Sequence, residues 1–254
     1  MSARPPEPFA PVLHLDECAS TNSEAMRLTL GGEPGPFWVS AERQTGGRGR
    51  QGRTWVSPAG NLCASLFLRL ACEPHTASQL SLVAGLALWD AVTDQPGYVA
   101  GRQRLQLKWP NDLLIGGAKC AGILVETSVV QPRQLASVIG FGVNVAAHPE
   151  ETGRPVTSLS AHGITTDRLR LLADLDAAIG RRLAQWQLGQ GFEAIRTEWQ
   201  ARALPPGEPI TVNTSGTRIS GRYAGLDPEG ALLLKEEGGT IRRIAFGEVV
   251  DAVG

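Results

Sequence analysis

Residues Lys108–Glu126 read KWPNDLLIGGAKCAGILVE. Gly116 and Gly117 separate two apolar runs, a pattern typical of a β-hairpin with a two-residue turn. The hairpin would carry Lys108 and Asp112 near its start and Lys119 just after the turn. Hairpins join antiparallel strands, so this stretch predicts a sheet that is not wholly parallel.

Working outward, alternating or apolar runs predict further strands at residues 12–15, 37–41, 62–70 and 135–143. Helical periodicity predicts helices that start near residue 20, and at 76–92, 167–188 and 192–203. Thr21 and Glu24 fit a capping box at the first helix, and Thr76 and Gln79 fit a second cap. Strands and helices in this order predict an α+β fold, in which helices cover a mixed β-sheet.

Pro205-Pro206-Gly207 interrupts the chain after the last predicted helix. Short strands separated by glycine turns follow, at residues 210–212, 217–226, 231–235, 240–245 and 248–251. This spacing predicts a small β-barrel. We therefore expect two domains, residues 1–204 and residues 205–254.

The stretch Glu42–Trp55 contains four arginines and four glycines between Arg43 and Arg53. A segment with so little to bury loses much entropy on ordering and needs a ligand that compensates for it. Glycine amides and guanidinium groups suit a multiply charged anion such as a nucleotide phosphate. Residues 47–52 also fit G-x-G-x-x-G, but a turn follows them where a dinucleotide site needs a helix. A simply solvated arginine loop is the remaining alternative.

Composition limits the function classes. A formal net charge of −1 gives no overall attraction to nucleic acid or to an anionic membrane. The four cysteines form no C-x-x-C pair and the four histidines are scattered, so we expect reduced thiols, no metal site and a cytoplasmic protein. Met1–Val12 lacks the apolar core of a signal peptide, and no apolar run is long enough to span a bilayer.

The chain resembles the biotin–protein ligases, also called biotin–acetyl-CoA-carboxylase ligases. The matching pieces occur in family order over residues 20–144: Ser20-Thr21-Asn22, the loop Gly46–Trp55, Lys108–Asp112, Lys119 with Gly122–Glu126, and Gly140-Phe141-Gly142-Val143-Asn144. The resemblance implies a catalytic domain like that of class II aminoacyl-tRNA synthetases, followed by an SH3-like barrel. It also implies an ATP- and Mg²⁺-dependent ligase that forms biotinoyl-5′-AMP and transfers biotin to a lysine of a biotin carboxyl carrier protein.

The resemblance further implies roles for individual residues. Biotin would be bound by Ser20, Thr21, Asn22, Gln44, Gly47, Arg48, Lys119, Gly122 and Gly142. ATP or the adenylate would be bound by Arg48, Arg50, Arg53, Trp55, Lys108, Asn111, Lys119 and Asn144. The catalytic residues would be Lys119, Arg50 and Asp112, with Asp112 orienting the acceptor lysine or accepting its proton. Trp55 as a plain core or lid anchor and Lys119 as a surface lysine remain open alternatives.

Only 19 residues precede Ser20, so we expect the monofunctional type, without an N-terminal DNA-binding domain and without DNA binding. The oligomeric state stays open, with a homodimer as one possibility. Two other functions also stay open: a lipoate or octanoyl ligase of the same fold, and a nucleic-acid-binding module built on the Arg-Gly loop. The few aromatic residues, 6% of the chain, disfavour the last.

Overall fold

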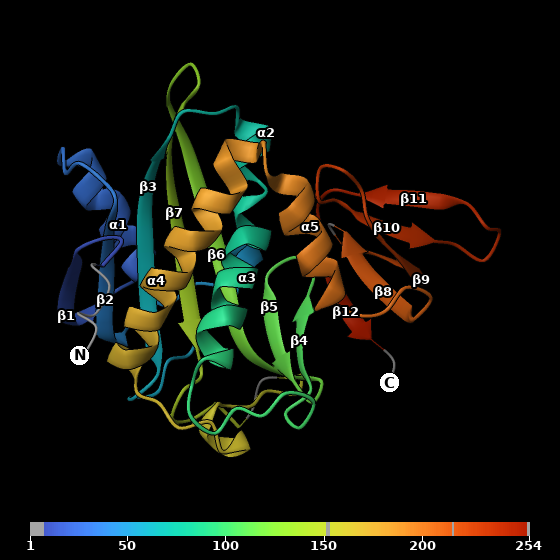
Figure 1. The fold of residues 1–254 in the computed structure, drawn as a ribbon, viewed down its shortest axis with the longest axis horizontal. Helices are drawn as coiled ribbons and strands as arrows, with labels where there is room; N and C mark the ends of the chain where they lie inside the picture. The colour runs from blue at the N-terminus through green and yellow to red at the C-terminus, as the bar shows by residue number, and fades with distance from the viewer. Residues whose placement is uncertain (1–7, 151–152, 215, 253–254) are drawn as a thin grey trace, which may run out of the picture.

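The computed structural model describes residues 8–150, 153–214 and 216–252, and arranges them as two β-sheets and a layer of helices (Figure 1). The strands of the first sheet are β1 (Val12–Cys18), β2 (Phe37–Gln44), β3 (Leu62–Leu70), β4 (Leu105–Lys108), β5 (Asp112–Ile115), β6 (Ala118–Gln131) and β7 (Gln134–Val143). They lie in the order β1-β2-β3-β7-β6-β5-β4. Strands β1 and β2 pair in parallel and every other neighbouring pair is antiparallel, which confirms the predicted mixed sheet.

The predicted hairpin is the pair β5–β6. Gly116 and Gly117 form its turn with φ angles of +59° and +85°, which only glycine adopts without strain. A bulge follows, because Leu113 pairs with Ala121 whereas Leu114 pairs with Lys119, so that Cys120 is the extra residue. Cys120 and Ala121 both lie in the main apolar core. The bulge therefore turns Lys119 to the opposite face of the sheet, where its ammonium lies near Gly122.

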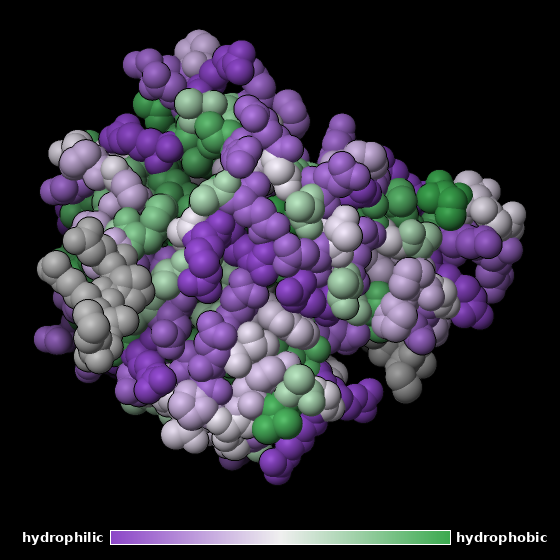
Figure 2. Space-filling model, in the orientation of Figure 1, coloured by the Kyte–Doolittle hydropathy of each residue, from purple (hydrophilic) through white to green (hydrophobic). Residues whose placement is uncertain are grey.

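Helices cover both faces of this sheet. They are α1 (Thr21–Leu30), α2 (Pro74–Ala77), α3 (Leu80–Thr93), α4 (Arg168–Trp186) and α5 (Phe192–Ala201). Helices α3 and α4 lie side by side on one face, where the main core is built (Figure 1). Helix α1 covers part of the other face, where Ala25 packs with Phe37 and Phe67. The outer surface on the α4 side is mostly hydrophilic (Figure 2), as expected for amphipathic helices that bury one stripe.

Two details of the helix predictions were wrong. The helix expected at 76–92 is split into α2 and α3, and Gln79 before α3 makes no side-chain capping bond. The proposed capping box is absent too, because Ser20 is the N-cap residue and Thr21 is already helical. The Thr21 hydroxyl bonds instead to Gln44, and the Glu24 carboxylate to Arg27. The two side chains that would form the capping box are therefore hydrogen-bonded to other residues.

The C-terminal strands are β8 (Pro209–Thr214), β9 (Thr217–Leu226), β10 (Leu232–Lys235), β11 (Ile241–Ile244) and β12 (Glu248–Ala252). They form an antiparallel sheet in the order β11-β10-β9-β8-β12, which is open rather than a closed barrel in the described residues. Its apolar side joins the core of the first sheet, and Trp109 Nε1 donates to the carbonyl of Gly230 at 3.1 Å. Apolar contacts therefore join the two sheets across the predicted domain boundary near residue 205.

Candidate active site

A cavity opens on the α1 face of the first sheet, beyond the N-terminal end of that helix. It holds about 650 Å³ of empty space, part of it continuous with solvent, which is a normal size for a small-molecule site. Most of the residues expected from the sequence line it: Ser20, Thr21, Asn22, Gln44, Arg48, Arg50, Arg53, Trp55, Asn111, Asp112, Lys119, Gly122 and Gly142. Residues far apart in the chain thus meet around one space.

One end of the cavity is polar and largely uncharged. Gln44 Oε1 accepts from the backbone N–H of Thr21 at 2.8 Å and lies 3.1 Å from its hydroxyl. Ser65 Oγ lies 2.7 Å from Thr21 Oγ1 and 2.6 Å from Asn22 Oδ1. Ser20, Thr21, Asn22 and Ser65 are all buried. Such fixed neutral donors and acceptors suit a neutral, hydrogen-bonding group of a ligand.

Glu126 bridges this polar end to the Arg-Gly loop. Its Oε2 accepts from Asn22 Nδ2 at 2.8 Å, and Arg48 Nη2 lies 3.3 Å from both carboxylate oxygens. Arg48 also donates to Ser23 Oγ at 3.2 Å. The loop is thereby held across the cavity from β6.

Glycines keep the floor of the cavity flat. A Cβ atom on Gly142 would lie 2.4 Å from the Trp55 ring, and one on Gly140 would lie 2.1 Å from Asn22 Oδ1. At Gly47 a Cβ would meet the Trp55 carbonyl at 2.5 Å. Trp55 therefore lies flat against the sheet and forms an apolar wall of the cavity, as expected, rather than part of the main core.

The other end of the cavity is cationic. Lys119 Nζ donates to Asp112 Oδ1 at 2.5 Å, and the side chains are only 11% and 3% exposed. Burial lowers the pKa of the Lys119 ammonium, and the negative charge of Asp112 opposes that shift. The same ammonium lies 5.6 Å from the centre of the Trp55 ring. Lys119 is thus buried and paired, and the surface-lysine alternative is wrong.

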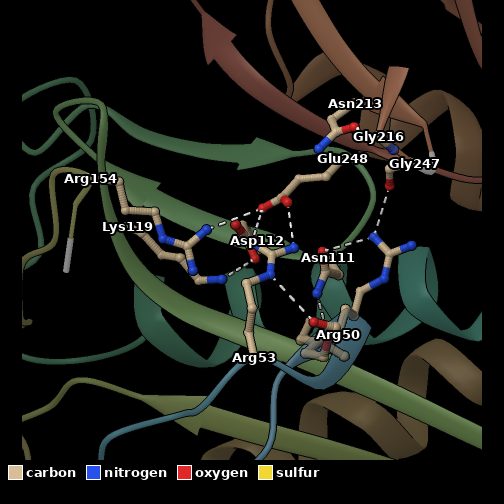
Figure 3. A network of polar contacts seen from close by, with 11 residues as sticks. Arg50, Arg53, Asn111, Asp112, Lys119, Arg154, Asn213, Gly216, Gly247 and Glu248 are labelled. Carbon is tan, nitrogen blue, oxygen red and sulfur yellow. Dashed lines mark hydrogen bonds and ion pairs between the residues drawn. The ribbon is translucent and has the colours of Figure 1, made fainter. Parts of the chain in front are cut away.

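Two loop arginines reach the C-terminal sheet (Figure 3). Arg50 Nη1 donates to the carbonyl of Gly247 at 3.1 Å and lies 3.5 Å from Asn111 Oδ1. Arg53 makes a two-pronged ion pair with Glu248, with one N–O distance of 2.8 Å. Burial alone would raise the pKa of Glu248, but the bonds from Arg53 and its charge outweigh burial and lower it. Residues 50–52 form only a short 3₁₀ turn where a dinucleotide fingerprint needs a helix, so that alternative is wrong. Arg50 and Arg53 bond to the protein, so these two side chains are not simply solvated.

Three expected residues, Gly47, Lys108 and Asn144, do not line this cavity. Gly47 lies close to the backbone of Trp55. Asn144 borders a neighbouring hollow that Trp55, Lys119 and Arg154 also line. There it donates to the carbonyl of Thr157 at 3.0 Å. Lys108 borders an apolar space between the two sheets. These positions do not contradict a role toward biotin for Gly47 or toward the nucleotide for Lys108 and Asn144, and each of the three roles stays a prediction.

Several residues of the site were given no role from the sequence. Among them are Arg154 and Glu248, which line the cavity, and Ser65 and Glu126, which bond to Asn22. Ser65 could have been noticed as a polar residue inside the apolar strand β3, and Glu126 as the charge that ends an apolar run. The Glu248 carboxylate accepts a hydrogen bond from Arg154 Nη1 at 3.1 Å, in addition to those from Arg53. Nothing near residues 154 or 248 in the sequence points to the loop, because only the tertiary fold brings them there.

Within the described residues, no group of three or more His, Cys, Asp and Glu side chains could hold a metal ion. Among the same residues, no helix is long and apolar enough to cross a membrane. All four cysteines have free thiols.

Comparison with known proteins agrees with this geometry. The sequence matches the biotin/lipoate A/B protein ligase family over residues 18–144 and the biotin protein ligase C terminal domain over residues 207–250. It is 43% identical over 226 residues to the biotin–[acetyl-CoA-carboxylase] ligase of Paracoccus denitrificans, covering 87% of this chain and 92% of that protein. Identity to the ligase of the same name from Mycobacterium tuberculosis is 35% over 239 residues, covering 92% of this chain and 86% of that one.

Among solved structures, the biotin protein ligase of Aquifex aeolicus in complex with biotin and ATP superposes with a TM-score of 0.76 at 29% identity. The match covers 94% of this chain and 97% of that one. Fold and cavity together define a ligase of the biotin/lipoate type, and the chain belongs to the biotin/lipoate A/B protein ligase family. Within that family it is a biotin protein ligase, which confirms the resemblance drawn from the motifs.

Proposed function

We propose that the protein activates biotin as biotinoyl-5′-AMP and transfers it to a lysine of the biotin carboxyl carrier protein or domain of acetyl-CoA carboxylase or a related carboxylase. One observation carries this proposal: a single cavity has a neutral hydrogen-bonding end, an apolar wall at Trp55 and a cationic end. Biotin has a neutral ureido ring, an apolar chain and a carboxylate. The three parts of biotin follow the same order as the three parts of the cavity.

In the first half-reaction a biotin carboxylate oxygen attacks the α-phosphorus of ATP, and pyrophosphate leaves. Two anions approach each other, so the site must supply positive charge. Lys119 and the loop arginines line the cavity where that charge is needed. Each charge-assisted hydrogen bond contributes about 1.5–3 kcal/mol net, so a few of them offset the repulsion. Mg²⁺ would arrive on the phosphates of ATP, because magnesium sites of this kind use few protein ligands.

In the second half-reaction the acceptor amine attacks the carbonyl carbon of the mixed anhydride, and AMP leaves. The amine loses one proton on the way. Asp112 and Glu248 are the carboxylates that line this end of the cavity, and Glu248 is bonded to Arg53 and Arg154. We propose that Asp112 orients the amine or takes that proton. Its bond to Lys119 at 2.5 Å fixes the position of this carboxylate.

Other features are consistent with this function. A lipoate ligase would share the fold, but the dithiolane ring offers nothing to the hydroxyls and amides around Thr21. We keep the division into a catalytic domain, residues 1–204, and a C-terminal domain, residues 205–254, as a proposal. We also propose a homodimer and a cytoplasmic location. Light scattering with and without biotin and ATP would test the dimer.

The decisive experiment is mass spectrometry of the purified protein after incubation with biotin, ATP and Mg²⁺. We expect bound biotinoyl-AMP. Pyrophosphate exchange with biotin or lipoate as the acid compares the two substrates directly. Exchange that depends on lipoate and not on biotin would refute the proposal.

A further inference from the structure

Asn61 is a buried polar residue at the end of the ladder between β3 and β7. Leu62 pairs with Val143, so the two residues just outside the ladder, Asn61 and Asn144, come side by side. Asn61 is 2% exposed. It is not among the described residues that line the cavity or the neighbouring hollow. Any effect of Asn61 on a ligand must therefore pass through other residues.

The Asn61 side chain holds the turn that follows β7. Its Oδ1 accepts from the backbone N–H groups of Val145, Ala146 and Ala147 at 3.0, 3.1 and 3.2 Å. Successive backbone N–H groups make a concavity that suits a negative or partly negative oxygen. Because these donors all face the oxygen, the amide nitrogen of Asn61 must face the other way. There it donates to the carbonyl of Ala147 at 2.9 Å.

The same amide nitrogen also orients Asn144. Asn61 Nδ2 donates to Asn144 Oδ1 at 3.4 Å, and Asn144 Nδ2 donates to the carbonyl of Thr157 at 3.0 Å. A carbonyl oxygen only accepts, so the Asn144 nitrogen must face Thr157 and the Asn144 oxygen must face Asn61. Asn144 is 2% exposed and borders the hollow. Its amide is thus held in one of the two orientations open to it.

The hollow that Asn144 borders suits the nucleoside part of ATP. It contains about 1020 Å³ of empty space, part of it continuous with solvent, and Val56 and Val156 supply apolar surface for a base. Trp55, Lys119 and Arg154 line both the hollow and the cavity, so the two spaces adjoin. With biotin in the cavity, the α-phosphate would lie near the shared cations and the base would lie in the hollow.

We propose that Asn61 is a positioning residue for ATP and not for biotin, because it fixes the Asn144 amide and the turn at the edge of the hollow. The inference rests on the proposed function, in which ATP is the second ligand. The side-chain contacts of Asn61 go to residues 144–147. The neutral end of the cavity is built instead around Thr21 and Gln44.

The test measures two affinities by calorimetry: biotin on the free protein, and α,β-methylene-ATP on the biotin-saturated protein. The methylene group replaces the oxygen that would leave with pyrophosphate, so no adenylate forms. In Asn61→Ala the turn loses its acceptor, and we expect the ATP analogue to bind about tenfold more weakly or worse. Biotin should bind as in the wild type. In pyrophosphate exchange, the KM for ATP should rise while the KM for biotin and kcat stay near their wild-type values.

A second variant separates the turn from Asn144. In Asn61→Asp the carboxylate still accepts from residues 145–147, but it cannot donate, so it faces the Asn144 oxygen without a proton between them. The ATP analogue should again bind more weakly than to the wild type. The double variant Asn61→Asp/Asn144→Ala should lose no more affinity than Asn144→Ala alone, since the effect passes through Asn144. If Asn61→Ala does not fold, Asn61→Asp provides the same comparison of ATP with biotin.

Ser160→Ala is the matched control. The exposed Ser160 donates to the carbonyl of Ala146 at 2.8 Å, so the substitution removes one bond to the same turn and leaves Asn61 and Asn144 unchanged. It should change neither affinity.

Unchanged binding of the ATP analogue to Asn61→Ala or to Asn61→Asp would overturn the inference. Equal weakening for biotin and for the analogue would overturn it as well, because a general loss of structure gives that result. Additive losses in the double variant would exclude Asn144 as the intermediary and overturn it too. If the wild-type protein bound no biotin, the proposed function itself would fail, which differs from the other outcomes because in those the wild type still binds biotin.

Discussion

Lys119→Ala removes the cation at the centre of the proposed adenylation site. The Lys119 ammonium is 2.5 Å from Asp112, and both side chains are almost inaccessible to solvent. The substitution therefore has two effects. It deletes positive charge where negative charge collects in the transition state, and it leaves a buried carboxylate without its partner.

The two effects have different sizes and different readouts. Loss of one stabilising donor costs about 10²–10³ in rate, or roughly 2.7–4 kcal/mol. Loss of one partner of a buried ion pair costs about 3–5 kcal/mol of folding stability. For a protein of this size each kcal/mol lowers Tm by roughly 2–4 °C, so Tm should fall by about 6–20 °C. The double variant Lys119→Ala/Asp112→Ala should recover most of that Tm loss and none of the adenylation.

The assay measures the two half-reactions separately. Biotin-dependent pyrophosphate exchange reports adenylation, and transfer from synthetic biotinoyl-AMP to an acceptor domain reports the second step. Both are run well below the Tm of the variant, so that the folded fraction is equal. We expect a large loss in exchange and a smaller one in transfer. Equal losses in the two steps would show that Lys119 does not act on the adenylation transition state.

Four further predictions follow from named contacts. Burial lowers the pKa of Lys119 from 10.5, so adenylation should decline as the pH rises through that lowered pKa; Lys119→Arg should move the decline to higher pH, and identical pH profiles would exclude Lys119 as its cause. Arg50→Gly should speed release of biotinoyl-AMP by about tenfold, equivalent to one lost hydrogen bond, and should increase labelling of an unrelated protein; unchanged release would argue against retention by Arg50. Gly142→Ala would place a Cβ atom 2.4 Å from Trp55, so the ring must move and biotin should bind roughly tenfold more weakly by calorimetry; an unchanged Kd would mean that Trp55 is not a wall of the biotin site. Deletion of residues 206–254 should lower both Tm and ATP use, because it uncovers the apolar contacts around Trp109 and removes Glu248; a wild-type Tm would show that the shared core contributes little.

Local sequence was sufficient for most of the strands. The run at 62–70 forms β3 with the predicted bounds, and the Gly116-Gly117 pair forms the predicted turn. These features depend on short-range patterns: alternation, apolar runs and the φ preference of glycine. The resemblance to a family then supplied site residues, and most of them do line one cavity.

The bulge at Cys120 could not be predicted in this way. Regular alternation from Gly122 would put Cys120 toward the cavity and Lys119 toward the helices. The observed pairing reverses this, since Cys120 lies in the main core and Lys119 bonds to Asp112. The preference for this arrangement comes from burial of the Cys120 side chain and the ion pair together. Both are tertiary terms that the local pattern does not contain.

Arg50 and Arg53 lie in the same Arg-Gly loop, and the local sequence does not distinguish them. Their contacts near the C-terminal sheet do. Arg53 faces the carboxylate of Glu248 through both ends of its guanidinium, whereas Arg50 faces the carbonyl of Gly247 and the amide of Asn111. Charged bidentate pairs are roughly twice as strong as bonds to neutral acceptors. A phosphate that enters the cavity therefore displaces the partners of Arg50 at lower cost than the partner of Arg53. On this reasoning Arg53 anchors the loop to the C-terminal sheet, and Arg50 is the arginine that exchanges its protein contacts for the adenylate.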